Sequence, residues 1–159
     1  MSLPTLKLTR ASFQVERWAQ FYADGKDIFP EHWRSLALNQ DEIPIDIDEA
    51  HYAKIDELGV LLIVTARVEG KLVGYYLSFL MPHFHYKSSG LMGLTDMYYV
   101  LPEFRNGTGW RLFMAWEREL KKRGVKKAIT SCKVHEDHSK LFTALGWTHS
   151  DNTFVKILA

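Results

Sequence analysis

Cysteine is almost absent from this chain of 159 residues, because Cys132 is the only one. A single cysteine excludes an internal disulfide and suits a reducing compartment, so we expect a cytoplasmic protein. An excess of charge of one sign is also missing: 20 Lys and Arg stand against 19 Asp and Glu, giving a formal net charge of +1. No global field therefore attracts nucleic acid or an anionic membrane, and we expect neither as a partner.

Long hydrophobic runs and internal repeats are lacking as well. The longest apolar stretch, around residues 60–64, is far too short to span a bilayer. No linker-like change of composition divides the chain. At about 150 residues per domain, the length predicts that residues 1–159 form a single domain.

Clusters of metal ligands are not evident either. His83 and His85 are two residues apart, as metal ligands can be, but no nearby Cys or acidic residue has zinc-like spacing. We therefore expect no metal site.

Hydrophobic periodicity and turn residues predict alternating helices and strands. In the first third, we expect a strand over 5–9, a helix from Ser12 to Gly25, a helix over 31–38, a loop over 39–48, and a helix over 49–58 capped by Asp48. The rest predicts strands over 60–68, 72–80 and 91–100, a helix over 108–123, a parallel strand over 125–132, and a terminal hairpin over 147–158.

The loop before the third helix carries an acidic run from Asp41 to Glu49. Such a run is usually a solvated loop with favourable charges at a helix start. The alternative is that it faces a cationic amine substrate.

The strand, tight loop and helix over residues 96–113 form the most informative stretch. Tyr98, Tyr99 and Val100 favour a strand, Pro102 cannot donate to a ladder, and a short glycine-bearing turn precedes the helix. Small residues let backbone amides approach a ligand, and the helix N-terminus favours an anion such as phosphate.

This stretch resembles the GCN5-related N-acetyltransferases, whose signature is a strand ending in Val-x-Pro, an Arg/Gln-x-x-Gly-x-Gly/Ala loop and a helix. The match is close over Val100-Leu101-Pro102-Glu103-Phe104-Arg105, and Leu141-Phe142-Thr143-Ala144-Leu145-Gly146-Trp147 is similar to a second family element. The resemblance covers roughly residues 60–158. A shortened glycine loop together with Phe142 is similar to small acetyltransferases encoded by tailed bacterial viruses. The resemblance implies a mixed α/β fold: a twisted, mostly antiparallel sheet flanked by helices, with a splayed parallel strand pair.

The glycine loop can be aligned with the family in two ways. Without a gap, Thr108 and Trp110 occupy the positions of the two small residues; with one residue deleted, Gly107 and Gly109 do. We prefer the shortened loop, because two bulky side chains would block the approach of a pyrophosphate.

The resemblance implies transfer of an acetyl group from acetyl-CoA to a primary amine, by direct attack in a ternary complex. Asp96 is the expected base, because an ammonium with a pKa of about 10.4 must lose a proton before it attacks. Small amine, peptide N-terminus and protein lysine all remain open as acceptor. The residues expected to bind the coenzyme are Tyr98, Tyr99, Val100, Arg105, Asn106, Gly107, Thr108, Gly109, Trp110, Arg111 and Phe142.

Phe142 departs from the family pattern, because many members have a tyrosine there that protonates the departing thiolate. A thiolate with a pKa of about 8.5 can leave unaided. His135 can supply the proton instead. The third account is a fold that binds acetyl-CoA without efficient transfer.

A protein of another class is the alternative: a binding protein that keeps this fold as a scaffold for a macromolecular partner. A cleft filled by Trp110 or by residues 81–90 would favour this alternative, and an open cleft faced by Asp96 would favour the enzyme. Five tryptophans permit a homodimer.

Overall fold

A computed structural model describes residues 10–158, and it is built around one five-stranded sheet with strand order β1-β2-β3-β4-β5. The first three pairings are antiparallel and the β4–β5 pairing is parallel. This confirms the mixed α/β architecture; the strand expected at 5–9 lies outside the described residues. The strands are β1 (Ser12–Glu16), β2 (Leu61–Val68), β3 (Lys71–Pro82), β4 (Leu91–Val100) and β5 (Val125–Ile129).

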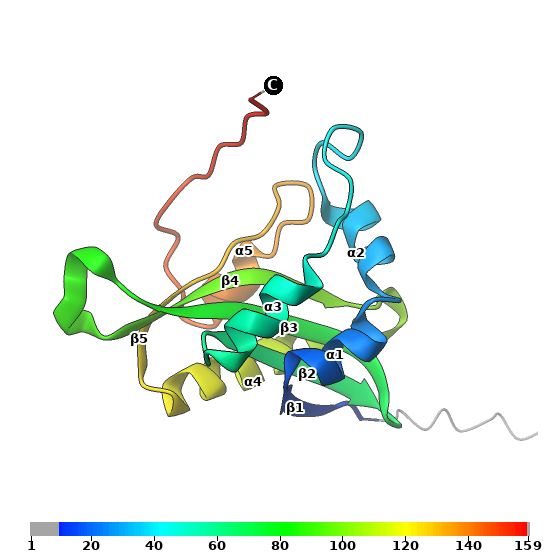
Figure 1. The fold of residues 1–159 in the computed structure, drawn as a ribbon, viewed down its shortest axis with the longest axis horizontal. Coiled ribbons are helices and arrows are strands. Elements are labelled where there is room, and N and C mark those ends of the chain that lie inside the picture. Colours follow the sequence, from blue (N-terminus) through cyan, green and yellow to red (C-terminus); the bar gives the residue numbers. More distant parts are fainter. Residues whose placement is uncertain (1–9, 159) are drawn as a thin grey trace, which may run out of the picture.

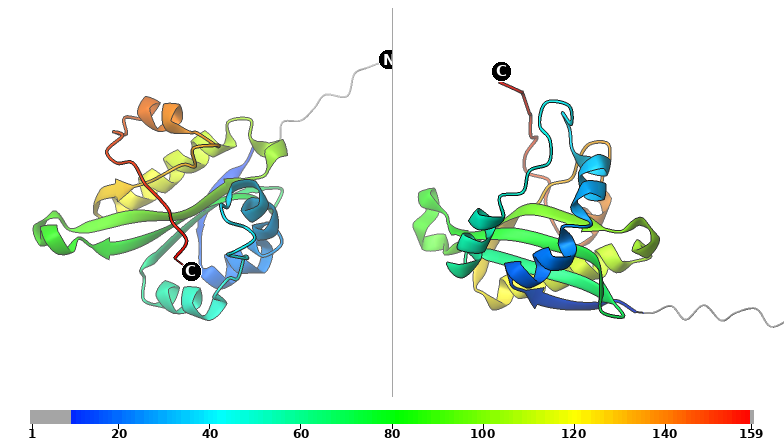
Figure 2. Two further views of the ribbon diagram at one scale, coloured as in Figure 1. Left: turned by 90° about the horizontal axis from the view of Figure 1, so that it is seen from above. Right: turned by 45° about the vertical axis from the view of Figure 1, so that its right-hand side comes forward.

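Helices cover both faces of the sheet (Figures 1 and 2). Three lie on one face: α1 (Trp18–Gly25), α2 (Phe29–Leu36) and α3 (Glu49–Glu57). The other face carries α4 (Thr108–Lys122) and α5 (Ser139–Ala144), and two short 3-10 helices are η1 (Phe84–Ser89) and η2 (Pro102–Phe104). The connection between β3 and β4, which contains η1, projects beyond the rest of the molecule (Figure 1).

Aromatic side chains fill the layers between the sheet and its helices. On the α1–α3 face, the rings of Trp18 and Tyr52 stack with centroids 4.3 Å apart. On the α4 face, Tyr76 stacks on Trp116 at 4.2 Å. Burial of one large apolar side chain contributes roughly 1.5–3 kcal/mol, so these two layers hold the helices against the sheet.

The chain's first described element corrects a prediction. Ser12 does not cap a helix, because Ser12–Glu16 is β1, paired with β2. The buried Glu16 carboxylate accepts two hydrogen bonds from the Arg67 guanidinium, at 2.7 and 2.9 Å, which secures the strand. The helix starts only at Trp18, whose amide donates to Oδ2 of Asp56 at 3.0 Å.

Other predicted elements are confirmed with small shifts. Asp48 caps α3 by accepting a 2.9 Å bond from the His51 amide. The β2–β3 hairpin turns at Glu69 and Gly70, both with positive φ. A Cβ on Gly74 would lie 2.9 Å from a β4 carbonyl oxygen, so glycine is required where β3 and β4 meet.

A bulge in β4 reorients the strand at Asp96. Leu77 pairs with Met97 and Ser78 with Thr95, so Asp96 is the extra residue without a partner on β3. Thr95 contacts the Tyr76 hydroxyl on the α4 face, whereas Asp96 bonds a residue of α3 on the opposite face. The bulge therefore turns this carboxylate toward the α1–α3 side.

The parallel strand pair separates early. Pairing joins residues 91–94 of β4 to 125–129 of β5, and β4 then continues alone to Val100. The strand predicted over 125–132 therefore stops at Ile129, because its partner diverges. This is the expected splay.

The terminal hairpin predicted over 147–158 is wrong, since no strand forms there. Phe154 is 91% exposed in this segment, so strand propensity alone does not order it. Within the described residues, no helix is both long and apolar enough to cross a membrane. Residues 10–158 also contain no group of three or more His, Cys, Asp or Glu suited to a metal ion.

Candidate active site

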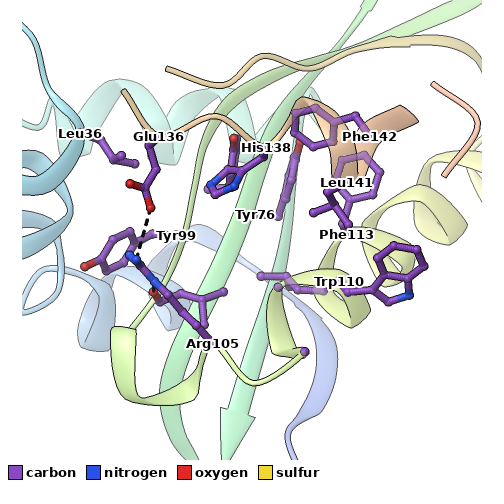
Figure 3. A pocket seen from close by; sticks show the side chains of 15 residues that line it. Leu36, Tyr76, Tyr99, Arg105, Trp110, Phe113, Glu136, His138, Leu141 and Phe142 are labelled. Atoms are coloured by element: carbon purple, nitrogen blue, oxygen red, sulfur yellow. Dashed lines mark hydrogen bonds and ion pairs between the residues drawn. The ribbon is translucent and has the colours of Figure 1, made fainter. Parts of the chain in front are cut away.

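A cavity of about 280 Å³ opens where β4 leaves β5, bounded by the start of α4 and by α5 (Figure 3). Figure 3 shows Glu136, Arg105 and Tyr99 on one side and apolar side chains of α4 and α5 on the other. We call this the first cavity. Its lining consists of Leu36, Tyr76, Tyr98, Tyr99, Val100, Arg105, Gly107, Gly109, Trp110, Leu112, Phe113, Glu136, His138, Leu141 and Phe142.

Two tyrosine hydroxyls bridge the gap between the diverging strands. Tyr98 donates to the carbonyl oxygen of Ser131 at 3.0 Å, and the Tyr76 hydroxyl lies 2.6 Å from Oγ1 of Thr130. Burial raises the pKa of Tyr98 well above its usual range, with smaller contributions from neighbouring negative groups. Both side chains therefore brace the cavity in their neutral form.

The glycine loop presents backbone amides at the start of α4. Gly107 is the N-cap residue, and its φ of 86° suits glycine. In the described part of the chain, the amides of Thr108, Gly109 and Trp110 have no protein acceptor. A Cβ on Gly109 would meet only a Val100 methyl at 4.0 Å, so the space beside these amides is open.

The other polar residues of the loop are engaged by the protein. Arg105 donates through Nε to the Val100 carbonyl at 3.0 Å, and its Nη1 lies 3.3 Å from Oε1 of Glu136. Arg111 does not line the first cavity and donates to the Gly107 carbonyl at 3.4 Å. Asn106 accepts a 3.4 Å bond from the Thr108 hydroxyl. Of the two arginines, Arg105 is the one at the cavity.

Asp96 lies on the α3 side of β4, where its Oδ2 accepts a 2.5 Å hydrogen bond from the Tyr52 hydroxyl. The residue keeps an exposed face, yet the surrounding protein raises the pKa of its carboxyl above the usual range. The bond from Tyr52 opposes that rise, because it favours the charged form. A carboxylate with a raised pKa holds a proton more strongly than an ordinary one, which suits a general base.

The residues expected near the leaving group lie on α5 and the turn before it. Phe142 lines the first cavity and packs on Phe113, with ring centroids 5.2 Å apart. His135 is exposed on the turn and lines neither of the two cavities described here. Three residues further on, the half-buried His138 does line the first cavity. The sequence predicts a histidine of this turn near the leaving group. It does not determine that His138, and not His135, lines the cavity, because that depends on the conformation of the turn.

A second cavity of about 270 Å³ adjoins the first, and Leu36 of α2 lines both. Sequence analysis missed this cavity, because its walls come from α2, the following loop and β4, which no local motif connects. Met97, immediately after Asp96, forms part of it. Its lining consists of Phe29, His32, Trp33, Leu36, Ala37, Ile45, Ile47, Met97 and Lys133.

The acidic run does not line either cavity with its carboxylates. Ile45 and Ile47 line the second cavity, whereas Asp41, Glu42 and Asp46 are exposed and absent from its lining. Asp48 is used as the α3 cap. The geometry fits a solvated loop rather than a cation-binding wall.

Comparison with known structures gives neighbours of the same fold. An N-acetyltransferase for ribosomal-protein alanine from Brucella melitensis biovar Abortus 2308 has a TM-score of 0.69 at 18% identity, covering 94% of this chain and 99% of that one. An aminoglycoside acetyltransferase from an uncultured soil metagenomic sample, in complex with sisomicin, has a TM-score of 0.69 at 14% identity and coverages of 94% and 95%. A predicted acetyltransferase with acetyl-CoA from Clostridium acetobutylicum has a TM-score of 0.66 at 15% identity, with coverages of 92% and 96%.

No curated protein sequence matches the chain. The family model described as "Acetyltransferase (GNAT) family", however, matches residues 18–147, which include α1 to α5 and all strands except β1. The chain therefore belongs to the GNAT acetyltransferase family.

Proposed function

We propose that this protein transfers an acetyl group from acetyl-CoA to a primary amine by direct attack. The observation that carries the proposal is the open first cavity between the diverging β4 and β5, with free backbone amides at the start of α4. It adjoins a second cavity, whose lining includes Met97, the residue after the candidate base. Two adjacent compartments suit two substrates held together, which lowers the entropic cost of reaction.

Acetyl-CoA fits the residues of the first cavity. The amides of Thr108, Gly109 and Trp110 offer hydrogen bonds to a pyrophosphate, which the positive end of α4 also favours. Gly107 and Gly109 leave room for this approach, as in the alignment with the shortened loop. Arg105 would add positive charge by exchanging its contact with Glu136 for one with phosphate.

The chemistry requires a neutral amine beside the thioester. The Asp96 carboxylate would take one proton from the ammonium, directly or through a water molecule. The amine nitrogen then bonds to the acetyl carbon, the carbon–sulfur bond breaks, and the sulfur leaves with its electron pair. The nitrogen, which is positively charged after the attack, loses its second proton to solvent. The products are an acetamide and coenzyme A, with the thiolate taking up a proton.

The proton for the thiolate has three candidate sources. Phe142 has no proton to donate. Water is the first source, and His135, predicted from the sequence, is the second. We add His138, because it lines the cavity that would hold the thiolate. A thiolate can also leave unprotonated, so either histidine would contribute modestly.

The open first cavity meets one of the two conditions that would favour the enzyme over a binding scaffold. The other condition is not met as predicted, because Asp96 lines neither cavity and lies beside the second only through its neighbour Met97. Trp110 is 39% exposed at the cavity rim instead of filling it, and residues 81–90 line neither of the cavities described. The cytoplasmic location and the homodimer stay predictions from the sequence.

Calorimetric titration with acetyl-CoA, coenzyme A and 3′-dephospho-coenzyme A tests the cofactor assignment. We expect micromolar dissociation constants, about 8 kcal/mol of binding free energy, that weaken without the 3′-phosphate. Release of free thiol on adding an amine then tests transfer. Absence of coenzyme binding would contradict the proposal; binding without amine-dependent thiol release would favour the scaffold.

A further inference from the structure

We propose that the second cavity selects amines carried on an apolar, preferably aromatic body, such as 2-arylethylamines, and rejects polycationic amines. The inference rests on the proposed function, because it identifies the acceptor class for the same site. Three features support it: the apolar lining of the cavity, the isoleucines that the loop after α2 adds to this lining, and Leu36, which the two cavities share.

The lining is apolar and carries no carboxylate among its described residues. Its two basic groups differ in charge at neutral pH. Burial, with a smaller contribution from Arg105, lowers the pKa of His32 to about 4, so this imidazole is neutral. The other basic group is the exposed Lys133 with its ammonium. A second positive charge on the acceptor would find no partner in this cavity and would meet Lys133, which disfavours polyamines and aminoglycosides.

Aromatic rings form one wall of the cavity. Phe29 and Trp33 lie there together with His32, whose ring stacks on Tyr99 with centroids 4.7 Å apart. The Nδ1 atom of His32 is also 2.6 Å from the Tyr75 hydroxyl, which fixes the orientation of the imidazole. A wall of fixed rings suits a flat apolar substituent, because it binds such a group without ordering mobile side chains.

The loop over 39–48 contributes its isoleucines to the lining. Ile45 and Ile47 line the cavity, while Asp46 between them is exposed and does not. Alternation along this segment thus turns its apolar side chains inward and its acidic residue outward.

The two cavities adjoin, and Asp96 precedes a residue of the second cavity on β4 without lining it. Leu36 lines both, and Met97 of the second cavity directly follows Asp96 on β4. An amine whose apolar body occupies the second cavity could therefore direct its nitrogen toward Asp96 and toward a thioester in the first. Burial of an aryl group in such a cavity is expected to raise kcat/KM roughly 10- to 100-fold over an amine that leaves the cavity empty.

The test compares 2-phenylethylamine, tryptamine and spermidine with the wild-type protein and two variants. In Ile45→Asp, a side chain that is 36% exposed and lines the cavity becomes acidic. In the control Ile43→Asp, a side chain of the same loop that is 55% exposed and outside the cavity lining changes in the same way. Both positions are solvent-accessible, so folding should be retained in both.

We expect kcat/KM for the two arylalkylamines to exceed that for spermidine at least tenfold. Ile45→Asp should reduce the ratio of kcat/KM for the arylalkylamines to kcat/KM for spermidine at least fivefold. Ile43→Asp should leave this ratio unchanged. A preference for spermidine, or equal behaviour of the two variants, would overturn the proposal.

A binding measurement separates this inference from the proposed function. Calorimetric titration of 2-phenylethylamine and spermidine into protein saturated with coenzyme A needs no turnover. Binding of the arylalkylamine alone, weakened by Ile45→Asp, supports the ligand class even if no acetyl group is transferred. Binding of spermidine alone, or of neither amine, overturns it even if coenzyme A binds as proposed.

Discussion

The Tyr52 hydroxyl donates a 2.5 Å hydrogen bond to Oδ2 of Asp96, which joins α3 to the bulge of β4. The Tyr52 ring in turn stacks on Trp18 at 4.3 Å, so α1 and α3 together position the candidate base. Asp56 at the end of α3 also accepts a bond from the first amide of α1. The helices of the first third of the chain thus orient a carboxylate that belongs to the central sheet.

Tyr52→Phe should keep the ring stack but remove the hydrogen bond to Asp96. The bond lowers the pKa of Asp96, so its loss should raise that pKa and reduce the ionised fraction at low pH. We expect the acidic limb of the kcat/KM profile to move to higher pH, because the ionised carboxylate loses a hydrogen bond that stabilises it. Tyr22→Phe is the control, because Tyr22 also stacks on Trp18; an equal displacement in both variants would argue against Asp96 as the base.

Asp96→Asn should remove the proton acceptor and preserve its shape. We expect kcat to fall roughly 100-fold at neutral pH with little change in the dissociation constant of acetyl-CoA, because Asp96 is outside the first cavity. Steady-state kinetics combined with calorimetry checks this. Unchanged turnover would show that the base lies elsewhere.

Gly109→Trp should block the first cavity without unfolding the protein. Gly109 has open space around its Cβ position, so the indole would project beside the free amides of α4. We expect coenzyme affinity to fall at least 100-fold, measured by calorimetry. Met114→Trp on the same helix, outside the cavity lining, should bind as wild type; equal affinity in both variants would refute the loop assignment.

His32 should make the protein less stable in mild acid. Its pKa is about 4 in the folded state against 6.5 unperturbed, so between these values the unfolded chain binds more protons. Unfolding free energy should therefore decrease as the pH falls from 6.5 to 4, by up to about 3 kcal/mol. His32→Asn can keep the bond to Tyr75 but cannot titrate, so urea unfolding at several pH values should show a flatter dependence. An unchanged slope would mean that His32 titrates normally.

Arg67→Met should be strongly destabilising, because it leaves the buried Glu16 carboxylate without its cation. We expect a loss of about 3–5 kcal/mol in urea unfolding. Lys122→Met breaks an exposed pair with Glu119 and should cost less than about 1 kcal/mol. Similar losses of unfolding free energy in the two variants would mean that the buried Glu16–Arg67 pair contributes no more to stability than an exposed pair.

Elements with strong local signals could be predicted, and elements that depend on distant partners could not. The β2–β3 hairpin, α4 and the Asp48 cap follow from periodicity, turn residues and capping chemistry. The prediction of a helix start at β1 is wrong, because the strand depends on its pairing with β2 and on the Glu16–Arg67 contact, which joins residues 51 positions apart. The terminal segment is predicted as a hairpin from its strand propensity, but it forms no strand, because it pairs with no neighbouring strand.

In the candidate site, too, features formed by residues close in sequence could be predicted, and features formed by distant segments could not. The strand–loop–helix motif identified the first cavity, because its residues are close in sequence. The Tyr52–Asp96 bond, the inward position of His138 and the second cavity arise from tertiary packing of α2, α3 and the segment after β5. No spacing rule connects those segments.

The separation of β4 from β5 has a consequence for aggregation. Past Leu94, β4 pairs with β3 alone, and an open strand edge of this kind can template association with another chain. Arg105 occupies the Val100 carbonyl at the end of that edge, and Tyr98 extends across it to the Ser131 carbonyl. Arg105 and Tyr98 of the first cavity therefore also hinder another chain from adding a strand at this edge of the sheet.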